Sequence, residues 1–251
     1  MRFQNTVTLI TGAGSGIGRA CAERLAREDG AAVCLDIEGE TAGETAKAAR
    51  DAGSRALGLA GDVAGCGDLE AARDAVLGEF GGFDRLVNSA GMVTMHSLWD
   101  LGPEDWHRVL DVNLTGALLA MQVCVPEMEK SGGGAIINIA SIEADAVVTS
   151  GDHIQPHYSA AMGGLKQLTR ASAHDLGRKN IRINAVAPGM IATGFSGSDS
   201  TSDKWTVMAS SRTALGPATA KRTSSPTRLP SCSPTRRATS PAFNCPSMAV
   251  G

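Results

Sequence analysis

The sequence predicts an α/β fold, a doubly wound parallel sheet of the Rossmann type in a single domain. Short apolar runs alternate with amphipathic stretches at helical spacing, and most of these runs are apolar nearly throughout, as in strands buried on both faces. The first run leads through glycines into a helix. A length of 251 residues suits one large α/β domain, and 43% hydrophobic residues supply a core.

The elements follow in order along the chain. The first strand is predicted at Thr6–Thr11, and the helix after it begins at Ile17, since Ile17, Cys21 and Leu25 share one helical face. Further strands are predicted at 31–37, 55–63, 84–91, 134–141 and 181–189. Further helices are predicted at 40–53, 68–80, 104–130 and about 158–178.

The remainder of the chain differs in composition and charge. From Arg212 to Gly251, six of the ten prolines fall among Ser, Thr, Arg and Ala without helical or strand periodicity. Residues 1–203 hold 16 basic and 26 acidic side chains, whereas the seven charged residues after Asp203 are all basic. A basic tail can bind nucleic acid, but this one lacks interleaved aromatic residues for base stacking. We therefore expect no nucleic-acid partner.

Several classes of protein are disfavoured. No run of 18 apolar residues is present, and the N-terminal stretch leads into a glycine loop instead of a signal-peptide cleavage site. The six cysteines form no CxxC pair, and the five histidines are dispersed. We expect a soluble cytoplasmic protein with reduced thiols, no membrane partner and no metal.

The motif "TGAGSGIG" (Thr11–Gly18) lies between the first strand and the first helix. Its glycines allow a tight turn and a close approach of the backbone to a pyrophosphate, which the helix N-terminus attracts. A glycine triplet can also be a simple loop, but the strand–turn–helix context favours a dinucleotide site. The residues expected at the cofactor are Gly12, Ser15, Gly16, Ile17 and Gly18.

Asp36 ends the second strand, 18 residues after Gly18. A carboxylate there accepts hydrogen bonds from the adenosine ribose and repels a 2′-phosphate, so NAD is favoured over NADP. The alternative is a plain cap at the strand end.

Together these motifs resemble those of the short-chain dehydrogenase/reductase family, from Thr6 to about Gly194. Besides the glycine motif and the residues Asn113 and Ser141, the resemblance rests on "GDV" (Gly61–Val63), "NSAG" (Asn88–Gly91) and "PGMIAT" (Pro188–Thr193). Ser89 departs from the family's usual NNAG. The resemblance implies further cofactor contacts by Asp62, Val63, Asn88, Ala90, Gly91, Tyr158, Pro188, Gly189 and Thr193.

The resemblance also implies hydride transfer between a nicotinamide and a secondary alcohol or ketone. Tyr158 would be the acid/base, Ser141 would bind the substrate oxygen, and Asn113 would be a structural and proton-relay residue. A free tyrosine has a pKa of about 10 and is a poor base near neutral pH. In the family, a lysine four residues later favours the phenolate and holds the ribose.

This chain has Met162 at the lysine position. A thioether carries no charge and cannot donate to ribose hydroxyls. Lys166 lies roughly 12 Å along the helix from Tyr158, against roughly 6 Å for position 162. Met162 could simply be a core residue, but its offset from Tyr158 predicts that it faces the cofactor. We expect weak or absent activity.

The segment between Ser141 and Tyr158 is expected to line the substrate mouth. Glu143, His153 and His157 are candidate substrate contacts, although a solvated loop position is the favoured interpretation for each.

Beyond Gly194, the short stretch "RTALG" (Arg212–Gly216) resembles the start of the family's C-terminal region, and the match stops there. Back-translation of the tail with a two-nucleotide offset can produce Val-Asp-Gly-Gly, which is similar to the family's C-terminal motif, so we hypothesise a frameshift. The expected units are a Rossmann-type NAD-binding and catalytic domain (1–195), a substrate-loop region (196–216) and an irregular tail (217–251). Family members are commonly dimers or tetramers that use this region, so the altered tail puts a homo-oligomer in doubt.

The predicted function is that of an NAD-dependent oxidoreductase on a small-molecule secondary alcohol or ketone, impaired by Met162. The alternative is a non-catalytic dinucleotide-binding protein or a defective gene product.

Overall fold

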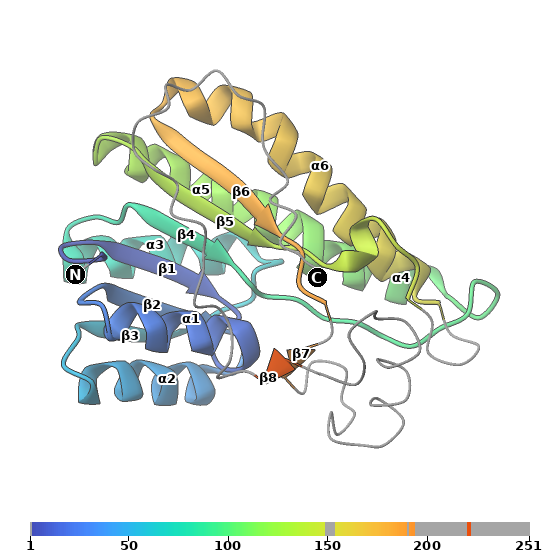
Figure 1. Ribbon diagram of the computed structural model, residues 1–251, viewed down its shortest axis with the longest axis horizontal. Coiled ribbons are helices and arrows are strands. Elements are labelled where there is room, and N and C mark those ends of the chain that lie inside the picture. Colours follow the sequence, from blue (N-terminus) through green and yellow to red (C-terminus); the bar gives the residue numbers. More distant parts are fainter. Residues whose placement is uncertain (1, 149–153, 190, 194–219, 222–251) are drawn as a thin grey trace.

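The computed structural model describes residues 2–148, 154–189, 191–193 and 220–221. Six parallel strands form one sheet in the order β3-β2-β1-β4-β5-β6 (Figure 1). The strands are β1 (Val7–Thr11), β2 (Ala31–Asp36), β3 (Ala56–Ala60), β4 (Arg85–Asn88), β5 (Gly134–Ile139) and β6 (Ile181–Val186). The predicted doubly wound fold is confirmed.

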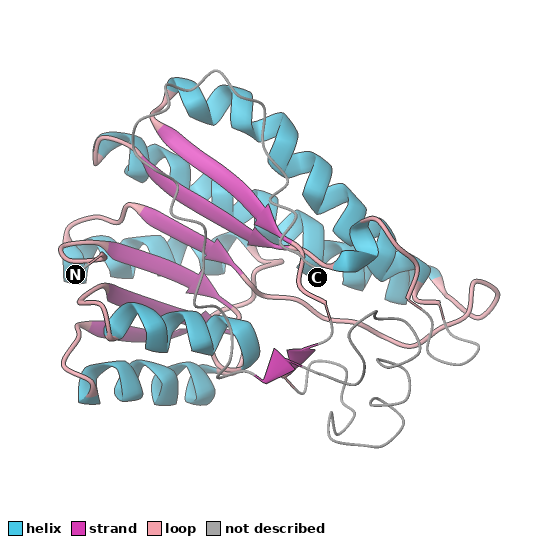
Figure 2. Ribbon diagram, viewed as in Figure 1, coloured by secondary structure: helices cyan, strands magenta, loops and turns pink. Residues whose placement is uncertain are grey.

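Helices lie on both faces of this sheet (Figure 2). They are α1 (Gly16–Ala26), α2 (Gly39–Asp51), α3 (Cys66–Phe80), α4 (Pro103–Leu110), α5 (Gly116–Lys130) and α6 (Pro156–Arg178). Side chains alternate along each strand, so Leu9 packs on the side of α3 and α5, while Ile10 packs on the side of α1 and α2. Burial on both faces explains why the strands are apolar nearly throughout.

The single helix predicted at 104–130 is interrupted. A π-helical segment, η1 (Asp111–Thr115), lies between α4 and α5 and contains the buried Asn113. Extra-wide turns of this kind often occur at functional sites. By length and composition the run Pro103–Lys130 could span a membrane. However, its buried residues Met121 and Met128 belong to the main core, so packing against the sheet accounts for its apolar character.

One part of the sheet is less well covered. On the face where α1 and α2 pack over β1–β3, the strand neighbours Val87 and Ile137 are only half-buried, and no helix among the described residues covers β4–β6 there. Two residues of the predicted tail form β8 (Ala220–Lys221), which pairs with β7 (Ile191–Ala192). The rest of the tail, with the hypothesised frameshift, lies outside the described residues.

Candidate active site

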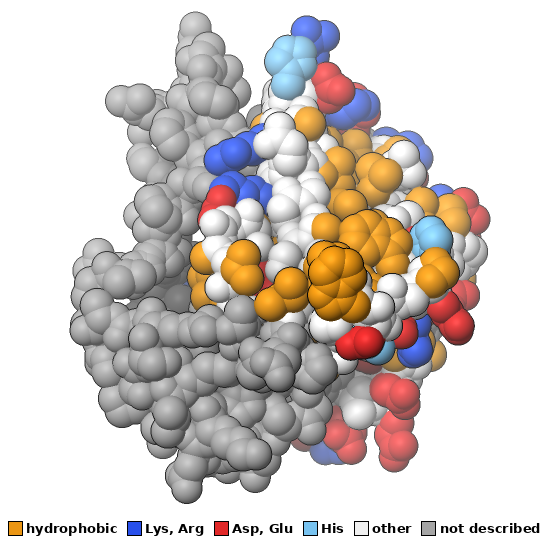
Figure 3. All heavy atoms as spheres, turned by 90° about the vertical axis from the view of Figure 1, so that its right-hand side faces the viewer, with side chains coloured by type: hydrophobic (Ala, Val, Ile, Leu, Met, Phe, Trp, Pro, Cys, Tyr) orange, Lys and Arg blue, Asp and Glu red, His pale blue; other side chains and the backbone are white. Residues whose placement is uncertain are grey.

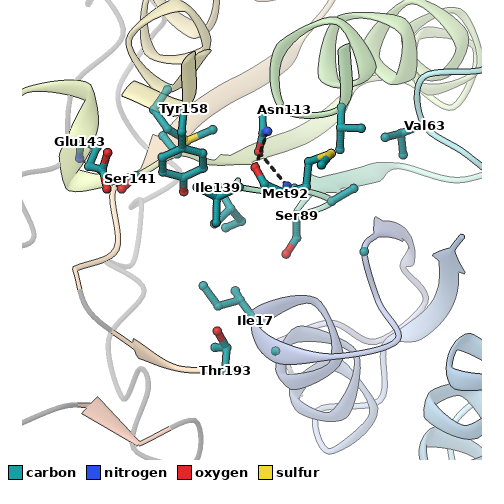
Figure 4. Close-up of a pocket in the computed structure, with 18 of the residues that line it drawn as sticks. Ile17, Val63, Ser89, Met92, Asn113, Ile139, Ser141, Glu143, Tyr158 and Thr193 are labelled. Carbon is teal, nitrogen blue, oxygen red and sulfur yellow. Dashed lines mark hydrogen bonds between the residues drawn. The ribbon is translucent and has the colours of Figure 1, made fainter. Parts of the chain in front are cut away.

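A cleft of about 840 Å³ opens where the strand order reverses between β1 and β4. Ligands bind at such switch points in open α/β sheets, beyond the carboxyl ends of the strands. The four predicted catalytic residues line it, namely Asn113, Ser141, Tyr158 and Met162. So do most predicted cofactor residues, namely Gly12, Ser15, Gly16, Ile17, Asp36, Asp62, Val63, Ala90, Gly91, Pro188, Gly189 and Thr193. Figure 4 shows Ser141, Tyr158 and Asn113 on one side of the cleft and Ile17 on the other.

The glycine loop after β1 packs too closely for a side chain at Gly12. Gly12 has a φ of +64°, and a Cβ there would lie 2.6 Å from the Cα of Ala90. Ser15, the N-cap of α1, makes no side-chain capping bond, so the first N–H groups of the helix are not capped by it. A closely approaching backbone, N–H donors that Ser15 does not cap and a helix dipole suit an anionic pyrophosphate.

The carboxylate of Asp36 performs the capping role that the sequence left as an alternative. Its Oδ2 accepts a hydrogen bond from the N–H of Gly14 at 2.8 Å, and its Oδ1 accepts one from Glu38 at 3.1 Å. The residue nevertheless lines the cleft, and a carboxylate has further lone pairs for ribose hydroxyls. Both interpretations are therefore compatible with this position.

Two of the predicted cofactor residues do not line the cleft. Gly18 lies inside α1, where a Cβ would meet the carbonyl oxygen of Gly12 at 2.2 Å, so its glycine allows close packing of the loop. Asn88 is buried, and its Nδ2 donates to Oδ1 of Asn138 at 2.9 Å. Gly18 and Asn88 therefore support the residues that line the cleft. Motif spacing alone does not distinguish a supporting residue from one that contacts the cofactor.

Asn113 is held in place by backbone contacts. Its Nδ2 donates to the carbonyl oxygens of Val109 and Met92, both at 2.8 Å, and its Oδ1 accepts from the N–H of Met92 at 3.2 Å (Figure 4). The amide thus ties η1 to the segment after β4, and nothing in the sequence indicated Met92 as its partner.

Ser141 and Tyr158 lie on the same side of the cleft (Figure 4). Ser141 caps the short 3-10 turn η2 (Ile142–Ala144), where its Oγ accepts a hydrogen bond from the N–H of Glu143 at 3.1 Å. Burial raises the pKa of Tyr158 to about 12, the bond to Ser141 opposes this shift, and the charge of Glu143 adds to it. The phenol is therefore held protonated near neutral pH.

Met162 is both a core residue and a residue of the cleft. It lines the cleft one helical turn beyond Tyr158, and it is also 2% exposed within a core cluster of Ala140, Ala161 and Leu165. Its thioether offers no positive charge to a phenolate. An uncharged, buried neighbour is consistent with the raised pKa of Tyr158.

Lys166 does not take the place of the missing lysine. It does not line the cleft, and its ammonium group pairs with Asp145 in the segment after η2. The charged residues that line the cleft within the described part of the chain are mostly acidic. They are Asp36, Asp62, Glu104, Asp111 and Glu143, against the guanidinium of Arg108.

The candidate substrate contacts separate into three cases. Glu143 lines the cleft and is partly buried, so it is more than a solvated loop residue. His157 is fully buried, does not line the cleft, and shares a 2.7 Å hydrogen bond between its Nε2 and Thr94 Oγ1. The solvated-loop interpretation of His157 was therefore wrong, because α6 begins at Pro156. His153 lies outside the described residues.

Exposed apolar side chains gather at the end of the molecule that holds the segments after β4 and β5. Figure 3 shows hydrophobic side chains gathered on this side. Large exposed apolar residues follow β4 and β5, namely Met95, Leu98, Trp99, Ile142 and Val147. Of these, Met95 and Ile142 also line the cleft, so part of its lining is apolar.

Comparison with known proteins agrees with this geometry. The chain is 40% identical over 192 residues to the cis-4-hydroxycyclohexanecarboxylate dehydrogenase of Sinomonas cyclohexanicum, covering 76% of this chain and 75% of that protein. It is 37% identical over 194 residues to the D-threitol dehydrogenase of Mycolicibacterium smegmatis, covering 76% and 72%.

Solved structures show the same fold. A short-chain type dehydrogenase/reductase from Mycobacterium marinum superposes with a TM-score of 0.81 at 27% identity, over 88% of this chain and 85% of that one. Another, a protein from Burkholderia xenovorans described as a short-chain dehydrogenase/reductase, gives 0.72 at 33% identity, over 76% and 73%. The short chain dehydrogenase family profile matches residues 6–204. The chain belongs to the short-chain dehydrogenase family.

Proposed function

We propose that this protein is an NAD(H)-dependent oxidoreductase for secondary alcohols and ketones whose proton-transfer step is impaired by Met162. The observation that carries the proposal is the meeting of Tyr158 and Ser141 in the same cleft as the glycine loop, with the uncharged thioether of Met162 at the position of the family's lysine. Relatives named as dehydrogenases of D-threitol and cyclohexanol support an alcohol substrate.

Different residues of the cleft would bind the cofactor and carry out proton transfer. When bound, the nicotinamide cofactor supplies the hydride acceptor or donor. The uncapped N-terminus of α1 and the loop at Gly12 bind its pyrophosphate, and Thr193 holds the nicotinamide end. Ser141 donates its hydroxyl hydrogen to the substrate oxygen. In ketone reduction the hydroxyl of Tyr158 gives its proton to that oxygen, and in alcohol oxidation the phenolate form of Tyr158 receives the proton from it.

We further propose that NAD is preferred to NADP. The carboxylate of Asp36 at the rim accepts hydrogen bonds from ribose hydroxyls and repels a 2′-phosphate. The charged residues that line the cleft are mostly acidic, with Arg108 as the arginine among them. Their negative charge also disfavours NADP, which carries more negative charge than NAD.

The impairment follows from charge. For alcohol oxidation Tyr158 must act as phenolate, and with a pKa of about 12 only roughly one molecule in 10⁵ carries that form near pH 7. Met162 adds no compensating charge. Ribose binding also loses the donor that a lysine would supply.

The test has two stages on the full chain. NADH affinity is first measured by fluorescence titration, and turnover of secondary alcohols with NAD is then compared between the chain and Met162→Lys. We expect binding by both and a substantial gain in turnover for the variant. Equal turnover would end the proposed impairment. Binding without turnover in either protein would instead favour a non-catalytic dinucleotide-binding protein.

We propose residues 1–195 as the NAD-binding and catalytic unit, with 196–216 as the substrate-loop region. We expect a cytoplasmic location, to be measured by fractionation. The homo-oligomer that is common in the family is in doubt because of the altered tail, and light scattering of the purified protein measures the oligomeric state.

A further inference from the structure

Glu143 has a position that the proposed chemistry does not use. It lies two residues after Ser141, in the turn η2, and its side chain lines the cleft beside Ser141 (Figure 4). Its backbone N–H donates to Ser141 Oγ at 3.1 Å, which couples the two residues in one rigid turn. The carboxylate is therefore next to the group that binds the reacting oxygen of the substrate.

Among the described residues, one carboxylate oxygen of Glu143 accepts a side-chain hydrogen bond and the other accepts none. Oε2 accepts a hydrogen bond from Ser159 Oγ at 2.9 Å, so α6 fixes the orientation of the group. No hydrogen bond to Oε1 occurs within the described residues, and no ion pair neutralises the charge there. An oriented carboxylate with one free oxygen accepts hydrogen bonds from a ligand.

The surroundings favour a neutral ligand that can donate. Burial raises the pKa of Glu143, whereas the bond from Ser159 lowers it. A substrate hydroxyl would replace the water lost by the partly buried carboxylate, while a substrate carboxylate would be repelled. Apolar neighbours such as Ile142 offer no hydrogen bond of their own beside it.

We propose that Glu143 is a specificity-determining residue, whose free Oε1 accepts a hydrogen bond from a second hydroxyl next to the reacting carbon. The substrate class would be vicinal diols and the matching hydroxyketones, with hydroxy acids excluded. This inference rests on the proposed function, because it assumes that the reacting oxygen lies at Ser141 and Tyr158.

A purely electrostatic role is the competing explanation. The charge of Glu143 also raises the pKa of Tyr158, so removing it would alter proton transfer. That effect would change turnover for alcohols with one hydroxyl and with two by the same factor. A direct contact would instead change the ratio between the two substrates, and it would appear in binding.

The experiment measures binding, which needs no turnover. Calorimetry or ligand-observed NMR on the full chain gives dissociation constants for butanediol with adjacent hydroxyls, for the four-carbon secondary alcohol and for the four-carbon hydroxy acid. We expect roughly tenfold tighter binding of the diol than of the simple alcohol. In Glu143→Gln, which keeps an acceptor for Ser159, the preference should shrink and the hydroxy acid should gain affinity.

Two further variants complete the test. Glu143→Leu removes every acceptor and should abolish the diol preference, and Glu44→Gln, an exposed charge change on α2 away from the cleft, should leave all ratios unchanged. The inference is overturned if the parent shows no diol preference, or if the preference survives in both Glu143 variants. Loss of the proposed function is a separate result, seen as no NAD-dependent turnover in Met162→Lys.

Discussion

The pKa of Tyr158 can be read directly, because this chain contains one tyrosine. Tyrosinate absorbance in the near ultraviolet therefore reports this residue alone, without cofactor or substrate. The perturbation of interest is Met162→Lys, which restores an ammonium group one helical turn from the phenol. We expect the pKa of Tyr158 to fall from its value of about 12.

The size of the shift follows from the placement. A cation about 5 Å from the phenolic oxygen, a distance that i, i+4 neighbours can reach, stabilises phenolate by roughly 3 kcal/mol at an effective dielectric constant of about 20. That corresponds to roughly 2 pKa units. Since the ammonium group loses hydration in the buried 162 position, we expect a net shift of about 1 to 2 units.

The assay is a spectrophotometric pH titration with circular dichroism recorded at each point. At pH about 10.5, roughly 3% of Tyr158 should be ionised in the parent and several-fold more in the variant, in which the lysine, with a reference pKa of about 10.4, titrates together with the phenol. Circular dichroism is needed because an unfolded chain titrates near about 10. Met162→Gln is the matched control, polar but uncharged, and should titrate close to the parent. If the Lys and Gln variants titrate alike while folded, the electrostatic argument is refuted.

Three further predictions concern stability. The pKa of Tyr158 is about 12 in the folded protein and about 10 in the unfolded chain, so the stability that this difference contributes below pH 10 is lost as pH rises toward 12. In Tyr158→Phe this part of the alkaline loss of stability should be absent, as measured by denaturant titrations at several alkaline pH values. Burial and the nearby His96 lower the pKa of His157, so stability should fall as pH drops below about 6.5, and a weaker pH dependence is expected in His157→Gln; an unchanged acid profile would contradict this. Gly12→Ala combines a left-handed φ with a clash, whereas Gly53→Ala has a left-handed φ but nothing within 4 Å of the added Cβ. Gly53→Ala should lower the free energy of unfolding by only about 1 to 2 kcal/mol, and Gly12→Ala by more. Equal losses in the two variants would argue against the clash.

Much of the fold could be predicted from local patterns. Strand and helix positions follow from hydrophobic spacing that each segment carries by itself, and the glycine turn after β1 follows from backbone demands that few residues other than glycine satisfy. The interruption at η1 was not predictable, because the apolar pattern of 104–130 continues through it. The structure shows that Asn113, inside this turn, bonds to the backbone of Met92, a contact between distant segments that the apolar pattern does not contain.

The site shows the same division. Sequence motifs indicated the residues that meet in the cleft, including Ser141 and Tyr158, which come from different elements. Motifs could not separate residues that touch the cleft from those that support it, as with Asn88, since both kinds occur in the same short segment. The sequence does not separate Glu143 from the other two candidate substrate contacts, His153 and His157. The hydrogen bond from Ser159, which orients the carboxylate of Glu143, appears only in the structure.

By itself, the sequence determined the family resemblance, the parallel sheet and the identity of the residue at the lysine position, because each is a property of short stretches of chain. Tertiary structure decided what surrounds those residues. Packing buries Met162 and raises the pKa of Tyr158, and the pairing of Lys166 with Asp145 leaves that cation outside the cleft. Burial, charge separation and hydrogen-bond partners depend on segments brought together from far apart in the chain, so they exist only once the sheet has formed.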